Sequence, residues 1–314
     1  MKQTSTFKAV LLAASSVLLM SAPAGFADET GEFAQFSSSA EVSNYVVDYR
    51  PIQQFTKAFA LEQRGRMKVS YAAVSQQGEA FMTQYKRYLS AVPVSSLSRD
   101  DQLAYWLNTR NMLVIDAMTS SSSRRRMSTQ RGTPTEPGKM WTESRITVEG
   151  VEMSIQDIEK NIILANFSDN PNVIFGMYQG TSGGPAFNGT GFTGANIDAE
   201  LEAVARDYVN SKNGLKISRK KAELPAIVGW YQNDVFGGDP ELAKTHLAGL
   251  AETKTAAKLA STTTISGRKF SYSSDELVIR QQSGGGGNSF GGGGGGSFGG
   301  GGSGGGSFGG GGGS

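Results

Sequence analysis

A glycine-rich segment at the end of the chain limits how much of this sequence can fold. Residues 284–314 hold 22 of the 42 glycines, and the only bulky side chains among them are Phe290, Phe298 and Phe308. Such a segment cannot bury enough apolar surface to offset the entropy that it would lose on ordering. We therefore expect a disordered tether. The alternative is a tail that makes weak contacts with a surface or with other copies through its three phenylalanines.

The first 27 residues follow the order of a secretory signal peptide. Lys2 and Lys8 come first, an apolar run occupies 9–20, and small residues then lead to Ala27. The run of about a dozen residues is too short for a membrane helix, which needs roughly twenty. We expect cleavage after Ala27 and bacterial export, to the periplasm or out of the cell, with no transmembrane segment left afterwards. A retained N-terminal anchor is the alternative.

These two segments set the expected organisation of the chain. A signal peptide at 1–27 and an extension at 28–44 precede one folded domain at 45–283, and the glycine-rich segment at 284–314 follows it. A domain of this length can bury one sizeable core. The chain contains no cysteine, which excludes disulfides, thiol catalysis and cysteine-ligated metals. Packing must therefore stabilise the domain.

The charges are balanced, with 30 basic and 28 acidic residues and a net charge of +2, so no nucleic-acid partner is expected. The local exception is the cluster 124–126 with Arg131, where four arginines predict a solvated loop or, as the alternative, a contact with an anionic surface. One histidine and no cysteine leave only oxygen ligands for a metal, and no Asp-x-Asp-x-Asp loop is present. We therefore expect neither a metal nor a cofactor, and the ligand or protein partner is unknown.

Three segments have the spacing of amphipathic helices. Ser98, followed by Asp101 at the third position, has the form of a helix start and predicts a helix over 100–118. Ser154 and Asp157 repeat this signal, so a second helix should follow Ser154. Apolar residues at helical spacing predict a third helix over 197–208.

Two segments favour strands. Residues 145–153 alternate around Gly150 and predict a short hairpin. Residues 173–178 form an unbroken apolar run that enters a glycine-rich turn, which is typical of a buried strand. Since helices outweigh strands, we expect an α+β fold, a single compact and mostly helical domain with a small sheet.

Four motifs in order resemble the family known as domain of unknown function 547 (DUF547), over roughly residues 45–279. They are Val69-Ser70-Tyr71-Ala72-Ala73, then Trp106-Leu107-Asn108-Thr109-Arg110-Asn111, then Gly150 through Ile158-Glu159, and finally Trp230-Tyr231 with Asp234 and Phe236. Each motif alone is weak, but the order of all four is fairly specific. The resemblance implies the fold more strongly than an activity.

The chain departs from the family pattern at three positions. Arg110 stands where the family usually has tyrosine, Lys160 where members commonly have histidine, and Gly184 where the cysteine would stand. If that cysteine and histidine form a thiol nucleophile and its base, both are missing from this chain.

The loop at 180–185 invites comparison with serine hydrolases. Ser182 fits the Gly-x-Ser-x-Gly elbow, but Pro185 and the glycines after it disfavour the helix that the elbow needs. The only histidine, His246, falls in an expected surface helix at 240–247, where a solvated side chain is the common case. We expect a tight turn that glycine permits, with a Ser182 and His246 pair as the alternative.

A second group of candidates is polar. Glu159 falls beside the apolar stripe of its helix and needs a partner, for which Lys160, Arg110 and Asn108 are candidates. A structural polar network is favoured over a catalytic acid. Arg110 lies four residues after Trp106, where it would snorkel or stack on that ring. Asn108 and Asn111 share a helix face, so they would line a polar cleft or cap neighbouring backbone.

Together these candidates define an expected cleft, in which Trp230 and Tyr231 should pack as core with their polar atoms bonded. Its members are Trp106, Asn108, Arg110, Asn111, Glu159, Lys160, Ser182, Gly184, Trp230 and Tyr231. The leading hypothesis is an exported, non-catalytic binding or surface-interaction protein. The alternatives are a hydrolase or transferase that uses Ser182, Glu159 or Lys160 in place of a thiol, and a protein assembled into a matrix or surface through its tail.

Overall fold

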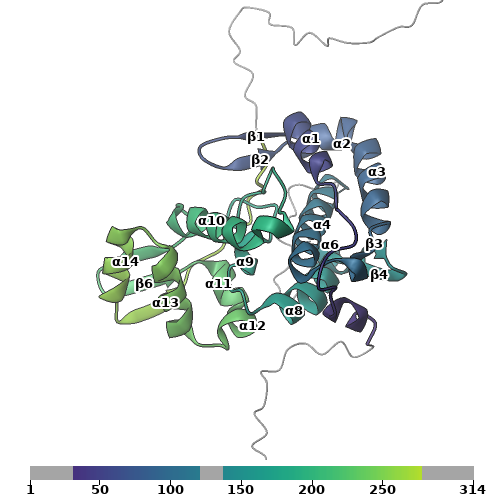
Figure 1. Ribbon diagram of the computed structural model, residues 1–314. Coiled ribbons are helices and arrows are strands. Elements are labelled where there is room, and N and C mark those ends of the chain that lie inside the picture. The colour runs from purple at the N-terminus through teal and green to yellow at the C-terminus, as the bar shows by residue number, and fades with distance from the viewer. Residues whose placement is uncertain (1–30, 121–136, 278–314) are drawn as a thin grey trace, which may run out of the picture. The chain divides into compact units, whose positions relative to one another are not determined.

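The computed structural model describes residues 31–120 and 137–277, all of which belong to one compact unit (Figure 1). The signal peptide expected at 1–27, the arginine cluster at 124–131 and the glycine-rich segment at 284–314 lie outside the described residues. The described part is mostly helical with small sheets, which confirms the α+β prediction. No helix in it combines the length and the apolar character that a membrane crossing needs.

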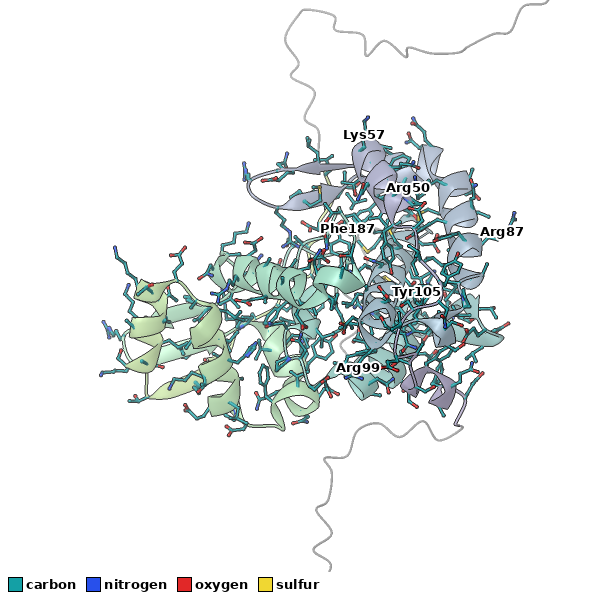
Figure 2. The ribbon with its side chains drawn as sticks, in the orientation of Figure 1. Arg50, Lys57, Arg87, Arg99, Tyr105 and Phe187 are labelled. Carbon is teal, nitrogen blue, oxygen red and sulfur yellow. The ribbon has the colours of Figure 1, made fainter. Side chains whose placement is uncertain are left out.

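The longest helix, α4 (Arg99–Ser120), lies at the centre of the core. Around it pack α2 (Tyr71–Gln77), α7 (Ile155–Asp157), α10 (Ile197–Asn210), the π-helix η4 (Ile158–Leu164) and the short 3-10 helices η2 (Val94–Ser96) and η5 (Gly194–Asn196). Because helices cover it on several sides, even its polar middle is buried, and Tyr105 lies inside the molecule while Lys57 and Arg87 extend outward (Figure 2).

Both expected helix starts are confirmed, together with the third helix. At α4, Asp101 accepts a hydrogen bond from the Ser98 hydroxyl at 2.9 Å, and the Asp101 amide donates to that hydroxyl at 3.3 Å. At α7, Ser154 and Asp157 form a complete capping box. The helix that begins there continues through η4 and α8 (Ala165–Phe167), and its π-helical middle was not predicted. The expected helix at 197–208 is α10.

The hairpin expected at 145–153 is also confirmed. Strands β3 (Ser144–Val148) and β4 (Val151–Ser154) are antiparallel and pair Val148 with Val151. Glu149 and Gly150 between them have φ angles of 48° and 85°. Two successive left-handed residues match the right-handed twist of the flanking strands.

The buried strand predicted at 173–178 is wrong. The segment is buried, but it begins as the helical turn α9 (Val173–Gly176) and becomes extended only at Met177. A short apolar run does not distinguish a strand from a buried helical turn. The surroundings decide here, because α9 packs against α10 and not against a sheet. A Cβ at Gly176 would lie 2.7 Å from Leu201 Cδ2, so glycine permits this close packing.

The remaining elements complete the unit. The helices are η1 (Ala34–Ser37), α1 (Arg50–Phe59), α3 (Glu79–Ser90), α6 (Lys139–Thr142), α11 (Ala226–Trp230), α12 (Gln232–Phe236), α13 (Pro240–Leu250) and α14 (Thr253–Ala260). The strands are β1 (Ala60–Glu62) and β2 (Met67–Val69), which form one hairpin, and β5 (Lys216–Ser218), β6 (Lys221–Leu224) and β7 (Thr264–Gly267), which form a three-stranded sheet in that order.

After β7 the chain returns toward the first hairpin as an extended segment, residues 271–277, which we call the C-terminal strap. It bridges to two places: Ser274 pairs with Thr181, and Glu276 pairs with Val69. The amide of Leu277 donates to the Val69 carbonyl at 2.9 Å. The C-terminal strap thus joins the β1–β2 hairpin to the loop at 180–185.

Candidate functional site

A buried ion pair connects α4 to the π-helix. The guanidinium of Arg110 donates to Glu159 Oε2 from Nη2 at 2.7 Å and from Nε at 3.1 Å. The Tyr231 hydroxyl donates to the other carboxylate oxygen at 2.5 Å. Arg110 is 0 % exposed and Glu159 is 5 % exposed. Of the three candidate partners of Glu159, the structure pairs it with Arg110, and Tyr231 is a further member that the sequence did not indicate as a partner.

Polar side chains in the middle of α4 form hydrogen bonds with backbone groups of other segments. Arg110 Nη1 donates to the Tyr178 carbonyl at 2.5 Å, while Asn111 accepts from the Tyr178 amide at 2.9 Å and donates to the Gly176 carbonyl at 2.8 Å. Asn108 bonds both backbone groups of Phe192, each at 2.8 Å. Of the two uses expected for these asparagines, backbone capping is the one that the structure shows.

Arg110 and Trp106 are not arranged as expected. Arg110 does not snorkel to solvent, and its cation lies 5.4 Å from the ring of Trp141 instead of on Trp106. Trp106 packs edge-on against Phe36 and Tyr105, at centroid distances of 5.1 and 4.9 Å. The ion pair with Glu159 draws the guanidinium inward, since a buried carboxylate needs a compensating charge.

Lys160 has a separate partner. Its Nζ lies 3.2 Å from Asp234 Oδ2 and 4.9 Å from the Tyr231 ring centroid, and the side chain is only 8 % exposed. Glu159 and Lys160 are consecutive and both buried, because six of the seven residues of η4 are buried and the helix is enclosed on almost every side. Single π-helical turns are frequent at functional sites, which draws attention to this pair.

Ser182 and Gly184 lie in the loop at 180–185, beneath the C-terminal strap. The Ser182 hydroxyl lies 3.0 Å from the Ser271 hydroxyl, and the Ser182 amide donates to the Ser273 carbonyl at 2.8 Å. No helix follows Ser182, as expected, so the geometry is not that of a hydrolase elbow. A Cβ at Gly184 would lie 2.4 Å from Gln179 Cβ, so this backbone leaves no room for a cysteine at that position.

A second buried ion pair fixes this loop. Arg66 donates to the carbonyls of Thr181, Gly184 and Pro185 at 2.9 to 3.1 Å. Its Nε donates to Asp275 Oδ2 of the C-terminal strap at 2.8 Å, and the Asp275 side chain is 0 % exposed. Three carbonyls and one carboxylate are thus joined through a single guanidinium.

His246 is not the solvated histidine that was expected, because its side chain is half-buried on α13. Its Nε2 lies 2.8 Å from Asn172 Oδ1, and its ring packs on Phe236 with a centroid distance of 5.6 Å. Burial lowers the pKa of the imidazole below its ordinary value. The partner of His246 is Asn172 and the partner of Ser182 is Ser271, so the Ser182 and His246 pair is not formed.

The expected cleft residues therefore separate into groups. Arg110, Asn111, Glu159 and Tyr231 form one buried network, and Lys160 adjoins it through the Tyr231 ring. Trp230 is half-buried and packs at a tilt against Phe270, the residue before Ser271, with a centroid distance of 4.3 Å. Tyr231 is core, as predicted, whereas Trp230 is only partly so.

Comparison with protein families decides what the central part of the chain is. Residues 94–209 match the family described as "Protein of unknown function, DUF547". Residues 94–209 are a DUF547 domain. The match includes α4, the β3–β4 hairpin, η4, the 180–185 loop and α10. The motifs at 69–73 and 230–236 lie outside it, so the wider extent of 45–279 stays a prediction. Neither the curated proteins nor the solved structures gave a match.

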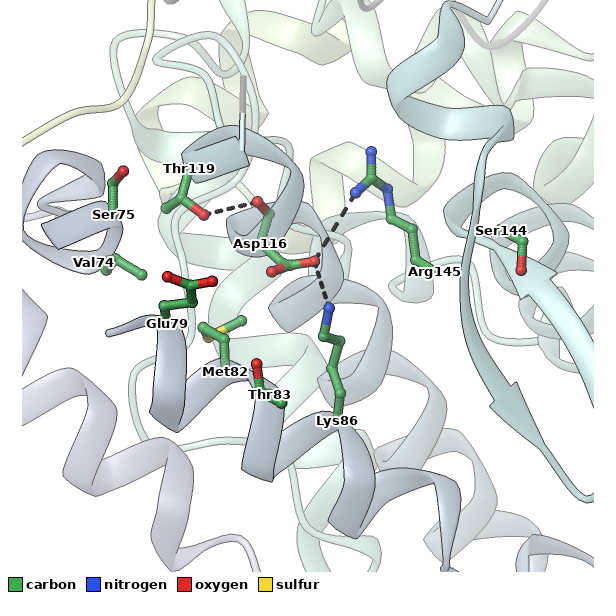
Figure 3. A pocket seen from close by; sticks show the side chains of 10 residues that line it. All are labelled: Val74, Ser75, Glu79, Met82, Thr83, Lys86, Asp116, Thr119, Ser144 and Arg145. Atoms are coloured by element: carbon green, nitrogen blue, oxygen red, sulfur yellow. Dashed lines mark hydrogen bonds and ion pairs between the residues drawn. The ribbon is translucent and has the colours of Figure 1, made fainter. Parts of the chain in front are cut away.

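The structure also shows a pocket that the sequence did not indicate, at the edge of the DUF547 domain. It has a volume of about 580 Å³ and is lined by Val74, Ser75, Glu79, Met82, Thr83, Lys86, Asp116, Thr119, Ser144 and Arg145 (Figure 3). These residues come from α2, α3, α4 and β3, and no motif links them. The one available signal is the seven-residue spacing of Glu79 and Lys86, which places both on one face of α3.

Metal binding finds no support in the same part of the chain. Among the described residues, no three histidine, aspartate or glutamate side chains gather in a way that could hold a metal ion.

Proposed function

We propose that the chain is an exported, non-catalytic binding protein built on a DUF547 domain. The observation that carries this proposal is the state of the loop at 180–185. The resemblance places the family's cysteine at Gly184, where Gln179 would meet a Cβ at 2.4 Å, and the C-terminal strap lies on the neighbouring residues Ser182 and Gly183. The strap thus occupies both the hydroxyl and the backbone amide of Ser182.

The three residues that could replace a thiol site each bind other groups of the protein. Both oxygens of Glu159 accept hydrogen bonds from the protein, which is a poor state for a general base. Lys160 is paired with Asp234, and Ser182 is bonded to another serine, which is not a base at neutral pH. These contacts support a structural role for Glu159, Lys160 and Ser182.

Export is proposed from the sequence of residues 1–27. The absence of cysteine is consistent with it, since an exposed thiol outside the cytoplasm is open to oxidation.

The proposal is tested by searching for turnover. The mature chain, residues 28–314, is incubated with panels of peptide, amide and ester substrates beside a Ser182→Ala variant. A Ser273→Ala variant, in the C-terminal strap, is the matched serine control. We expect no turnover above buffer in any of the three. Turnover by the native chain and the Ser273→Ala control that disappears in Ser182→Ala would overturn the proposal.

A further inference from the structure

The pocket of about 580 Å³ is polar on most of its wall. Hydroxyl groups come from Ser75, Thr83, Thr119 and Ser144, while Val74 and Met82 are its apolar residues. The remaining wall is formed by two acidic and two basic side chains (Figure 3). A cavity with many hydrogen-bonding groups and little apolar surface suits a polar, charged ligand, because an apolar molecule would leave these groups without partners.

At one end of the pocket the charged lining residues are two cations, Lys86 and Arg145, and one carboxylate, Asp116, while the more exposed Glu143 near Arg145 does not line it. Lys86 Nζ lies 3.0 Å from Asp116 Oδ2, but Arg145 Nη1 lies 3.9 Å from that same oxygen and Arg145 Nη2 lies 3.6 Å from Glu143. Close ion pairs have separations of about 2.7–2.9 Å, so the terminal nitrogens of Arg145 are held only loosely. The side chains of Arg145 and Asp116 are 14 % and 15 % exposed, which strengthens electrostatic contacts relative to open water. An incoming carboxylate can bind there.

The other end of the pocket carries Glu79, at the start of α3. Its side chain is exposed and forms no ion pair within the described part of the chain. Glu79 and Lys86 are seven residues apart, which in an α-helix is two turns, or about 10 Å along one face. The pocket thus has an acidic residue and a basic residue whose backbone positions on α3 are that far apart.

We infer that this pocket binds a short peptide of two or three residues by its free termini. An extended chain advances about 3.5 Å per residue, so three residues match the distance between Glu79 and Lys86 on α3. The peptide carboxylate lies on Lys86 and Arg145, its ammonium group lies on Glu79, and the hydroxyl groups of the wall bond its amides. This inference rests on the proposed binding function and names its ligand class.

The test titrates the mature chain with tri-alanine and with two blocked forms, N-acetyl-tri-alanine and tri-alanine amide, by isothermal calorimetry. We expect tri-alanine to bind, and loss of the carboxylate charge to weaken binding about tenfold, as a charge-assisted contact with two cations would. Loss of the ammonium charge should weaken it about threefold, because Glu79 is exposed and its contact is screened. Free alanine, which cannot reach both Glu79 and Lys86, should bind more weakly than tri-alanine.

Variants link the effect to the pocket. Lys86→Met should weaken tri-alanine binding about tenfold, and Glu79→Gln should abolish the difference between tri-alanine and its N-acetyl form. Lys57→Met, at an exposed lysine of α1 that does not line the pocket, is the matched control and should bind as the native chain does. Glu79→Gln changes an exposed residue and keeps its shape, so it tests the inference even if Lys86→Met folds poorly.

Two results would overturn the inference. One is no heat of binding for tri-alanine at millimolar concentration, and the other is binding that neither Glu79→Gln nor Lys86→Met changes. Neither result bears on the proposed lack of catalysis, which depends on turnover and on Ser182. Conversely, turnover lost in Ser182→Ala would refute the non-catalytic proposal whether or not tri-alanine binds.

Discussion

Arg110 and Glu159 are buried charges, and each makes the burial of the other tolerable. Removing two ions from water costs several kcal/mol, which their attraction and additional hydrogen bonds offset. Here the additional bonds are those from Tyr231 to the carboxylate and from the guanidinium to Asn111 and the Tyr178 carbonyl. The network is thus sensitive to loss of one charge.

Glu159→Gln should lower the free energy of unfolding by about 3–5 kcal/mol, because it leaves the Arg110 guanidinium buried without a counter-charge. Urea denaturation followed by circular dichroism measures the change. The matched control is Asp169→Asn, which removes the carboxylate from an exposed pair with Arg99 and should cost less than about 1 kcal/mol. Equal losses in the two variants would show that the buried pair is not structural.

His246 gives the stability of the protein a pH dependence of known sign. Because burial lowers the pKa of the imidazole in the folded state, the unfolded chain takes up the proton first as the pH falls. The contribution is fully present above the unfolded value of 6.5 and is lost as the pH decreases through it toward the folded value. Stability should therefore decline on acidification from pH 7.5 to 5.

His246→Gln should flatten this part of the stability curve, since glutamine does not titrate while its amide can still donate to Asn172. Urea midpoints measured across the pH range for both proteins provide the comparison, with Thr245→Ala, at an exposed neighbour, as control. Because His246 is the only histidine, its imidazole resonances give the folded pKa directly. A pKa at or above 6.5 would contradict the assignment.

Single residues differ in how well the sequence alone predicts their roles. Glu159 was identified because a carboxylate beside an apolar stripe needs a partner, and Arg110 was among the candidates. The pocket residues Lys86, Asp116 and Arg145 were missed because they come from three elements far apart in sequence, and only the fold brings them together. Ser182 was misleading, since a glycine-rich loop around a serine has several structural uses.

At the scale of elements, the sequence predicted correctly those features whose hydrogen bonds join residues close together in the chain. The helix start at Ser98, the capping box at Ser154 and the turn at Glu149 and Gly150 depend on residues within three positions of one another, and all three were predicted correctly. The helical turn α9 was predicted as a strand, because its conformation depends on α10 and α4 around it. The π-helix η4 has no sequence signal in this chain.

The C-terminal strap is held by backbone bonds and by one buried ion pair, that of Asp275 with Arg66. Asp275→Asn should lower stability by about 2–4 kcal/mol, since Arg66 would keep its three carbonyl partners but lose its counter-charge. The amides of Ser182 and Gly183, which donate to carbonyls of the strap, should exchange hydrogen faster.

Hydrogen exchange read by mass spectrometry or NMR checks this expectation. Glu223→Gln, which weakens the more exposed pair with Lys216 on the small sheet, is the matched control and should leave exchange in the loop unchanged. If the loop amides exchange at native rates in Asp275→Asn, the strap is held by its backbone bonds alone and the ion pair is dispensable.

At the scale of the whole molecule, the DUF547 match and the folded unit have different extents. The match ends at residue 209, but the unit continues to 278, and the hydrophobic core includes residues on both sides of that limit. Leu247 and Leu259, for example, are buried in the same core. We therefore expect residues 210–277 to be required for folding and not to form a separate module.

Export is the property of the whole molecule that the sequence predicts most directly and that a single variant tests. Cleavage of a signal peptide requires a small residue immediately before the cut. Full-length chain expressed in a bacterial host should yield a product that begins at Asp28, read by intact mass. Ala27→Arg should block processing and leave a larger, membrane-associated form, whereas Ala34→Arg, at an exposed residue of η1, should be processed normally. An uncleaved, full-length mass from the native chain would contradict the prediction, because the 27 residues would then not be removed.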